Sequence, residues 1–416
     1  MKWAIPALGQ IATITGGSTP SRTQAEYWNG SIPWLTPTDL PMPGKGIADV
    51  SDTAAKITEE GLAAISAQLL PVGTVLFSSR ATIGKLGISR VPLATNQGFA
   101  NFIPKRFVDA KYLAYCLLRH KTEITALAGS TTFKEVTKTA LKKFRVPLPP
   151  LSEQRRIVEI LDQADALRRK RAEADAKAAR ILPALFYKIF GDPVTNPKGW
   201  PIKRISEVCR VISGATPRTN QPEYWGGGIP WATPRDLSGL DDWVLEQTER
   251  TLTGEGLSSC SATMMPKGAV LLSSRAPIGL VAIAGVPMCT NQGFKNLICE
   301  GDIDSWYLFA WCKLRKSYLQ SLGRGATFTE VSKSIVESIE LPLPPIKTQR
   351  EFRERVNLLR SIHEQRRISL RQIENTFQVL LHRAFTGDLT AKWREAHMKE
   401  LLKEMEEQTR YLDKTH

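Results

Sequence analysis

The sequence predicts a mixed α/β fold class, in which two similar α/β domains alternate with two long helices in a pseudo-twofold internal repeat. Three observations predict it. One set of short motifs occurs twice in the same order, strand-like runs in each set lie between glycines and prolines, and a glycine-free helical stretch follows each set. We expect domains at residues 1–150 and 193–345, long helices at 151–192 and 346–388, and a charged helical extension at 389–416.

The repeated motifs fix the order of the two domains. Their copies are 197 residues apart early in each domain and 195 apart later, so the domains differ by two residues in between. The early motifs are Gly-Ser-Thr-Pro at 17–20 with Gly-Ala-Thr-Pro at 214–217, and Ile-Pro-Trp at 32–34 and 229–231. The later ones are Ser-Ser-Arg-Ala at 78–81 and 273–276, Asn-Gln-Gly-Phe at 96–99 and 291–294, and Pro-Leu-Pro-Pro at 147–150 and 342–345. So many matches in register exclude chance.

Each domain is expected to combine strands with helices. Runs such as 73–78 and 268–273 are short, apolar and bounded by glycine or proline, which indicates strands joined by loops. A helical stretch follows near 112–120 and 306–316. Each domain is therefore predicted to be mixed α/β.

The amino-acid composition changes after the proline-rich end of each domain. Ser152 and Lys347 open runs rich in Gln, Glu, Arg, Leu and Ala, which predict long helices. Their apolar spacing of three and four favours a coiled coil between the two helices. The alternative is packing of each helix on its own domain, but ~35 residues at ~1.5 Å each are longer than a small domain needs. Pro183 is expected to kink the first helix.

The composition points to a polyanionic partner. The chain has 56 Lys and Arg residues against 41 Asp and Glu, a net charge of +15, and the basic residues are spread along it. Solubility alone is the simpler explanation of this charge. With no signal peptide and no apolar run of ~20 residues, we expect a cytoplasmic location and no membrane partner. The six cysteines form no Cys-x-x-Cys pair, so neither a zinc site nor a disulfide framework is indicated.

Catalytic signatures are missing from the sequence. It has no Gly-x-x-x-x-Gly-Lys-Ser/Thr phosphate loop, no Gly-x-Gly-x-x-Gly turn, and no Asn/Asp-Pro-Pro-aromatic run of the adenine-methyltransferase type. Acid-x-Lys triplets such as 175–177 occur in nucleases, but they are common, and this one falls on the predicted coiled coil. We therefore expect a binding or scaffolding chain with no catalytic residue, cofactor or metal of its own.

In the order of its motifs, the sequence resembles the specificity subunits of type I restriction-modification systems over nearly its whole length. The resemblance rests on Gly-x-Thr-Pro with Ile-Pro-Trp, Ser-Ser-Arg-Ala-x-Ile-Gly, Asn-Gln-Gly-Phe, and Pro-Leu-Pro-Pro before Gln154-Arg155 or Gln349-Arg350. It implies two target-recognition domains separated by two antiparallel helices, each domain reading half of a bipartite site. The last helix would lie beside the first domain.

The resemblance also implies partners. They are double-stranded DNA, two modification (methyltransferase) subunits and the restriction (translocase-nuclease) subunits. S-adenosylmethionine, ATP and Mg would belong to these partner subunits alone.

Candidate DNA-contacting residues fall into two groups, because phosphate contacts position a protein whereas base contacts specify sequence. Residues that recur in both domains suit a scaffold or phosphate role. They are Arg80, Asn96, Gln97, Arg275, Asn291 and Gln292. An ion pair at a strand end would explain the arginines without DNA, and a turn would explain the Asn-Gln pairs.

Positions that differ between the domains are better candidates for reading bases. They are Ser21 against Arg218, with Arg22 beside it, Thr38 against Arg235, Lys85 against Leu280, and Lys134 against Thr329. Arginine and lysine favour guanine edges, and a threonine methyl can meet that of thymine. Four tryptophans could stack on bases, although tryptophan beside proline is more often a core residue. These are Trp28, Trp34, Trp225 and Trp231.

Two other functions stay open at this point: a stand-alone sequence-specific DNA-binding protein, and a DNA methyltransferase or nuclease with an unrecognised site. Two similar domains also predict half-sites that are related when read on opposite strands, with the differing positions breaking the symmetry. The charged extension, with residues such as Glu400 and Lys403, fits either a solvated face or a subunit contact.

Overall fold

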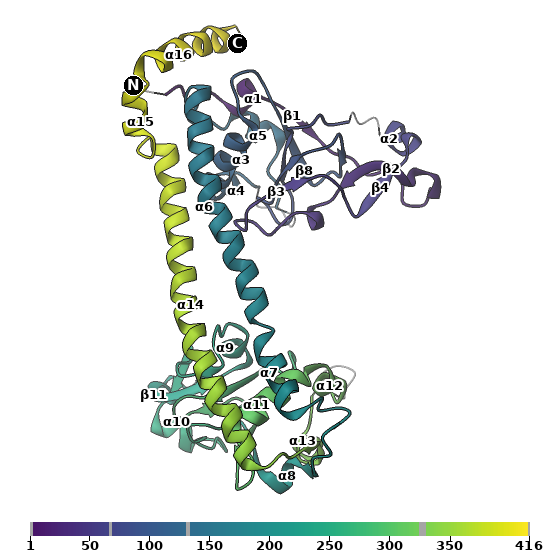
Figure 1. Cartoon of the computed structure of the whole chain (residues 1–416), viewed down its shortest axis with the longest axis vertical. Helices are drawn as coiled ribbons and strands as arrows, with labels where there is room; N and C mark the ends of the chain where they lie inside the picture. Colours follow the sequence, from purple (N-terminus) through teal and green to yellow (C-terminus); the bar gives the residue numbers. More distant parts are fainter. Residues whose placement is uncertain (1–2, 66–68, 130–133, 324–329, 415–416) are drawn as a thin grey trace. The chain divides into compact units, whose positions relative to one another are not determined.

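The computed structural model describes residues 3–65, 69–129, 134–323 and 330–414. It divides into two compact units, the first made of Met1–Lys170 with Arg371–His416 and the second of Arg171–Leu370. Figure 1 traces the elements of both. Within the described ranges, no helix has the length and apolar character needed to cross a membrane.

The first unit contains two mixed sheets. The larger has the order β1 (Ala12–Gly16), β8 (Phe99–Pro104), β5 (Val75–Ser78), β6 (Leu86–Ser89), β3 (Ile47–Val50), and the smaller has the order β4 (Ala55–Ile57), β2 (Trp28–Leu35), β7 (Ala94–Thr95). The β3–β6 and β2–β7 pairs are parallel, and the other pairs are antiparallel.

The second unit repeats both sheets strand for strand. The larger has the order β10 (Cys209–Ser213), β17 (Phe294–Cys299), β14 (Val270–Ser273), β15 (Val281–Ala284), β12 (Val244–Leu245), and the smaller has the order β13 (Arg250–Leu252), β11 (Trp225–Ala232), β16 (Cys289–Thr290). A further pair joins β9 (Ile202–Arg204) to β18 (Glu340–Pro342). The internal repeat read from the motifs is therefore a repeat of topology.

One helix packs on the larger sheet of each unit. Helix α3 (Ala110–Arg119) contacts β5 and β6, and α11 (Ser305–Leu314) contacts β14 and β15. Each begins at an aspartate, Asp109 or Asp304, whose carboxylate accepts hydrogen bonds from backbone N–H groups of the first turn. The shorter helices are α1 (Leu8–Ile11), α2 (Glu59–Ala64), α4 (Lys121–Ala126), α5 (Lys138–Lys143), α8 (Ile205–Val208), α9 (Pro234–Ser238), α10 (Gly254–Ser258), α12 (Lys316–Ser321) and α13 (Lys333–Ser338).

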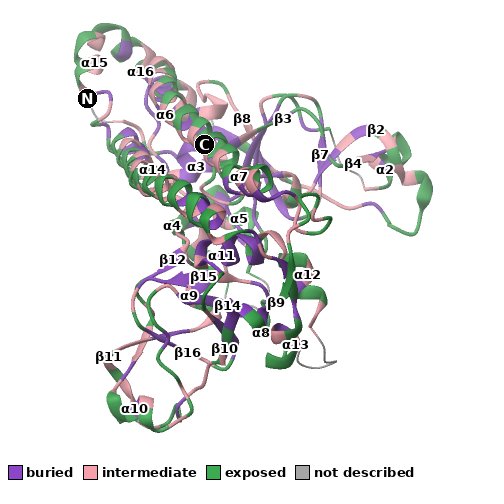
Figure 2. Ribbon diagram, turned by 60° about the horizontal axis from the view of Figure 1, so that its bottom comes forward, coloured by how far each residue is buried: buried purple, intermediate pink, exposed green. Residues whose placement is uncertain are grey.

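Buried residues concentrate in these layers. Figure 2 shows the central strands of the larger sheets and the α3 and α11 helices largely buried, while α2 and α10 face solvent. Each unit has its own main apolar cluster, one around Tyr112 and Phe102 and the other around Tyr307 and Phe309. Two separate cores agree with two domains.

Long helices follow each domain, as the sequence predicts. They are α6 (Leu151–Ala178) with α7 (Ile181–Phe190), and α14 (Ile346–Thr386). The Gln that recurs after each Pro-Leu-Pro-Pro motif anchors the start of each helix. Gln154 is fully buried; its side-chain oxygen accepts from Asp109 N, and its NH2 group donates to Phe107 O and Pro149 O. Gln349 makes the same three contacts in the second unit. This motif is thus a structural joint between domain and helix.

The predicted kink at Pro183 is a break between Ala178 and Ile181. Proline has no N–H to donate four residues back, and its ring clashes with the carbonyl of that residue. That residue is Ala179, where the helix is interrupted. The interruption therefore has a local cause.

Within each unit the two helices run antiparallel. In the first, Arg168 pairs with Glu374 at 2.9 Å, and Glu153 accepts a hydrogen bond from Thr390 at 2.6 Å. The residue earlier in the first segment thus contacts the residue later in the second, so the segments run in opposite directions. In the second unit, Asp175 pairs with Arg366, and Phe186 further along α7 contacts Phe352, which lies earlier in α14. The expected helix pairing is confirmed. The helices also pack on their domains, since α6 and α14 share the core cluster of the first unit with α3.

The extension forms α15 (Ala391–Ala396) and α16 (Met398–Asp413). It packs on the first unit: Leu401 is buried, Gln408 Nε2 donates to Leu148 O at 3.1 Å, and Glu404 accepts from Ser152 N at 3.0 Å. The end of the described chain is therefore part of the first unit and not only a solvated face.

Candidate nucleic-acid interface

The smaller sheet of each unit carries a pair of tryptophans. Trp28 and Trp34 meet edge to face with centroids 5.0 Å apart, and Trp225 and Trp231 do the same at 4.9 Å. The indole N–H groups donate to backbone carbonyls at 3.0–3.2 Å, so both pairs are held by the frame. Trp34 and Trp231 are buried core residues, whereas Trp28 and Trp225 keep a face toward solvent.

In the first unit this pair lines an open groove of ≈ 470 Å³. The groove is lined by Arg22, Trp28, Trp34, Thr36, Thr38, Ala54 and Ala55. It brings together two residues predicted as base readers, Arg22 and Thr38. Ser21 directly precedes Arg22 in the chain, and its carbonyl accepts the indole N–H of Trp28. Arginine, hydroxyl and aromatic groups on one groove are suited to contacts with base edges.

The second unit presents a more basic version of the same surface. Arg218 and Arg235, its predicted readers, are both exposed, and Arg235 lies 3.5 Å from Glu249. A further arginine, Arg250, lies over Trp225 at 3.4 Å from the ring centroid. Sequence reasoning did not select Arg250.

The recurring arginines form ion pairs. Arg80 lies 2.7 Å from Glu135, and Arg275 lies 2.9 Å from Glu330, each beside a bridge between the two backbones. Burial alone would raise the pKa of Glu330, but hydrogen bonds and charges from Lys295 and Arg275 outweigh it and lower the pKa. These geometries match the explanation without DNA, although both arginines remain exposed.

Lys134 is also exposed, and its carbonyl accepts the N–H of Ala81, next to Arg80. Its counterpart Thr329 lies outside the described residues. The first unit therefore places two basic candidates, Arg80 and Lys134, side by side on neighbouring segments.

The Asn-Gln motifs build turns. Asn96 Oδ1 and Asn291 Oδ1 each accept the N–H of the glycine two residues on, at 2.9 Å. Gln97 and Gln292 are exposed and accept hydrogen bonds from Thr19 and Thr216 of the Gly-x-Thr-Pro loops. In both units the turn is therefore bonded to the Gly-x-Thr-Pro loop, with the Gln side chain exposed at the surface.

Glycine is required in that loop by close backbone approach. A Cβ on Gly17 would lie 2.1 Å from Asn96 O, and one on Gly214 would lie 2.0 Å from Asn291 O. Any side chain here would separate the loop from the turn.

Lys85 needs a correction. It is only 8% exposed, and its ammonium donates to the carbonyls of Pro37 and Leu40, the latter at 3.1 Å. Its counterpart Leu280 packs against an apolar cluster. The prediction that Lys85 reads bases is wrong for this structure, because the side chain at this position points into the domain interior. A lysine there must donate its hydrogen bonds to backbone carbonyls, and the second unit has an apolar residue instead.

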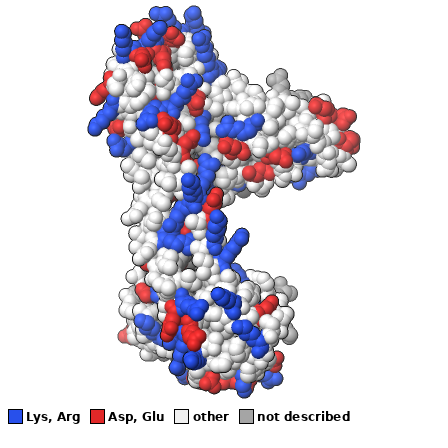
Figure 3. Space-filling model, viewed as in Figure 1, with Lys and Arg blue, Asp and Glu red and all other residues white. Residues whose placement is uncertain are grey.

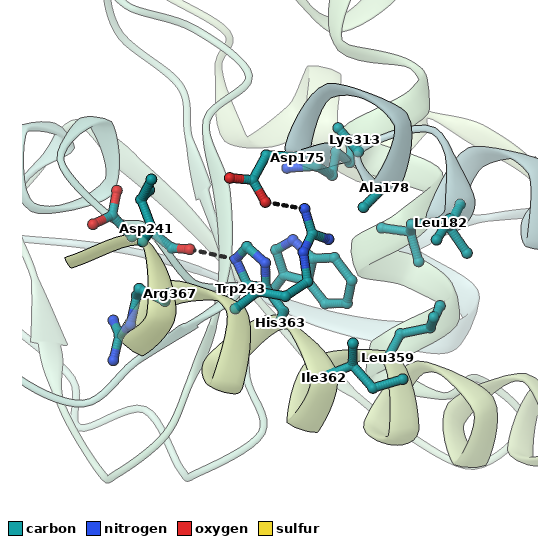
Figure 4. A pocket seen from close by; sticks show the side chains of 14 residues that line it. Asp175, Ala178, Leu182, Asp241, Trp243, Lys313, Leu359, Ile362, His363 and Arg367 are labelled. Atoms are coloured by element: carbon teal, nitrogen blue, oxygen red, sulfur yellow. Dashed lines mark hydrogen bonds and ion pairs between the residues drawn. The ribbon is translucent and has the colours of Figure 1, made fainter. Parts of the chain in front are cut away.

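A separate cavity of ≈ 410 Å³ lies in the second unit between α14, the α6–α7 break and the loop before β12. Asp175 pairs with Arg366 at this cavity. Figure 4 shows His363 hydrogen-bonded to the backbone carbonyl of Asp241. The rings of His363 and Trp243 stack, with centroids 5.9 Å apart. The lining of this cavity is mostly apolar. The cavity therefore fits packing between the helices and the domain better than binding of an anion.

Charge is distributed over both units. Lys and Arg side chains lie among acidic ones and along the long helices, as Figure 3 shows for one face. Among the described residues, no group of three or more His, Cys, Asp and Glu is placed to hold a metal ion.

Known proteins that are similar in sequence to this chain are named as specificity subunits of type I restriction enzymes. A family model described as Type I restriction modification DNA specificity domain matches residues 1–174 and again residues 197–372. The MjaIX specificity subunit of Methanocaldococcus jannaschii is 41% identical over 158 residues, which cover 38% of this chain and 37% of that one. The EcoR124I/EcoR124II specificity subunit of Escherichia coli is 34% identical over 38% of this chain and 40% of its own. These two matches span less than half of each relative.

Longer matches exist at lower identity. The putative MjaX specificity subunit of M. jannaschii is 26% identical, with 83% of this chain and 87% of that one covered. Two solved structures share the fold. One is a chain from a study of assembly and conformational transition in a type I R-M system, with a TM-score of 0.59, 20% identity and coverage of 93% and 98%. The other is the S subunit from M. genitalium, with a TM-score of 0.54, 13% identity and coverage of 92% and 96%.

Proposed function

Because the chain belongs to the family of type I restriction modification DNA specificity domains, we propose that it recognises a bipartite DNA sequence for an enzyme complex. Each unit binds one half-site. The single observation that supports this most is the duplication: the same two sheets occur twice, and the same DNA specificity model matches each copy. The net charge of +15 supports the attraction to phosphates.

The proposed readers are the exposed residues around the tryptophan pairs. They are Ser21, Arg22, Thr38, Arg218 and Arg235. Arg80, Gln97, Arg275 and Gln292 are proposed to contact phosphates, because they are exposed and recur in both units. Lys134, which is exposed and differs from its counterpart Thr329, stays a proposed base reader.

The proposed partners are double-stranded DNA, two modification subunits and the restriction subunits. Exposed apolar side chains on the long helices support docking of the modification subunits there. They are Leu167, Leu358, Ile362, Ile368 and Val379. S-adenosylmethionine, ATP and Mg act in those partners, so this chain supplies the sequence choice and they supply the chemistry.

The first prediction concerns the chain with and without its cognate modification subunits. Purified samples are incubated with DNA and S-adenosylmethionine, and methylated adenines are mapped by sequencing. We expect methylation at one split motif from the mixture alone. Methylation by the chain on its own would contradict a non-catalytic role, and sequence-specific binding unaffected by the modification subunits would favour a stand-alone DNA-binding protein.

The same map tests the duplication. Two similar domains predict half-sites related when read on opposite strands, with departures where Ser21, Thr38 and their counterparts differ. Two unrelated half-sites would contradict this expectation.

A further inference from the structure

One position of the shared fold holds a small apolar residue in the first unit and an arginine in the second. In the first unit Ala55 on β4 pairs with Trp34 on β2, and in the second Arg250 on β13 pairs with Trp231 on β11. Both central strands hold the same place in their three-stranded sheets. Ala55 and Arg250 are therefore equivalent.

Arg250 is positioned by aromatic faces. Its guanidinium carbon lies 3.4 Å from the ring centroid of Trp225 and 5.5 Å from that of Trp231. Among the described residues it has no ion pair, whereas Arg80, Arg235 and Arg275 each have a glutamate within 4.0 Å. The positive charge of Arg250 is therefore supported by ring faces and is not neutralised by a carboxylate.

Ala55 leaves the same place open. The methyl group lines the groove of the first unit together with Trp28, Trp34 and Thr38. In the second unit Arg235 takes the place of Thr38 and Arg250 that of Ala55. The second surface therefore has arginines at two places where the first, whose groove includes Arg22, has uncharged side chains. The shared frame therefore presents two different surfaces to the same kind of ligand.

We propose that Arg250 reads a guanine in the half-site of the second domain, an inference that rests on the proposed function. Guanine offers two acceptors, O6 and N7, in the major groove, and the planar fork of arginine matches them. Stacking on Trp225 fixes the plane of the fork before DNA arrives, so little side-chain freedom is lost on binding. The unpaired charge leaves the donors of Arg250 available.

Substitution of Arg250 tests this with the complex of chain and modification subunits. Arg250→Ala and Arg250→Met both remove the fork, while Met keeps side-chain volume over Trp225. Both are expected to lower the preference for guanine at one position of the second half-site by about 5- to 150-fold, with the rest of the motif unchanged. Thermal unfolding measured beside the methylation map shows that the domain remains folded, and Arg250→Met provides this control if Arg250→Ala does not fold.

The reverse substitution is Ala55→Arg. It is expected to create a new guanine preference in the first half-site. Arg210→Ala is the control for the loss of an arginine, because Arg210 is an exposed strand residue of the second unit paired with Glu300 at 3.2 Å, and it should leave the motif unchanged.

The outcomes distinguish failure of the guanine role from failure of the proposed function. If the wild-type complex methylates a split motif but Arg250→Ala and Arg250→Met leave it intact or weaken methylation at every site equally, the guanine role is overturned and Arg250 contacts phosphate or only the fold. A wild-type complex with no split motif overturns the proposed function itself.

Discussion

Glu153 is a single carboxylate that ties three distant segments of the first unit together. It is fully buried and accepts hydrogen bonds from Trp3 Nε1 at 3.0 Å, Thr390 Oγ1 at 2.6 Å and Arg394 Nε at 2.8 Å. A buried carboxylate is tolerated only when its charge and lone pairs are satisfied, and here they are. Thr348 occupies the corresponding place in the second unit, so this network belongs to the first unit alone.

Replacing Glu153 by Gln should therefore be costly. The positive charge of Arg394, 14% exposed, would lose its partner, and breaking such a pair costs about 3–5 kcal/mol. The measurement is the free energy of unfolding in urea. Glu159→Gln, on the exposed face of the same helix, is the control and should change it by less than about 1 kcal/mol. Equal stability of the two variants would contradict the role given to Glu153.

The chemistry of individual residues also explains which features of the fold and site can be predicted from the sequence and which cannot. The recurring motifs are visible because close packing and turns demand fixed residues, as at Gly17 and Asn96. Lys85 was misjudged because a lysine that donates to carbonyls looks like any other in the sequence. Arg250 was missed because it lies where the two copies change offset, and only the pairing of Trp231 with Arg250 aligns it with Ala55.

The long helices can be predicted from the spacing of their apolar residues, but the specific polar contacts between them cannot. Their existence and approximate ends follow from composition and repeat, and Pro183 indicates where the first is interrupted. The polar partners across the pair do not follow from spacing, since they depend on register. In the second unit, Asp175 of α6 pairs with Arg366 of α14 and with Arg171 one turn before it, at 3.1 Å.

This joint predicts a dependence on pH. Burial alone would raise the pKa of Asp175, but the hydrogen bonds and charges of Arg366 and Arg171 outweigh it and lower the pKa below its ordinary value of 3.8. A carboxylate with a lowered folded-state pKa stabilises the fold above the unfolded value, and this contribution is lost as the pH falls through the folded pKa.

We therefore expect wild type to be more stable than Asp175→Asn near neutral pH, with the difference shrinking below about pH 4. Thermal unfolding from pH 3 to 7 measures it. A difference that stays constant over this range would contradict the assignment, because it would show that charge plays no part.

At the scale of the whole molecule, two cores serve one chain. The second unit is continuous in sequence, Arg171–Leu370, whereas the first is assembled from both ends of the chain. The order of domain and helix explains this, since α14, which follows the second domain, supplies Phe377, Leu381 and Phe385 to a core that begins with Leu8 and Ile11. The extension then packs on that core through Leu401 and Gln408.

Truncation after Leu389 should therefore destabilise one unit only. Calorimetry of the full chain is expected to show two transitions, and the truncated chain should lose stability in one while the other keeps its midpoint. Arg410→Ala, at an exposed site of α16, is the control and should resemble wild type. A uniform shift of both transitions would contradict independent cores.

The split first unit also sets an order on biosynthesis. A ribosome finishes the strands of the first domain early, yet the apolar side chains of Phe377, Leu381 and Phe385 that complete its core are made more than 200 residues after Leu161, with which they share it. The second unit emerges whole in the meantime. The domain that begins first can therefore reach its native state only after the second has been synthesised, and until then its unfinished core must remain soluble without the helix that covers it.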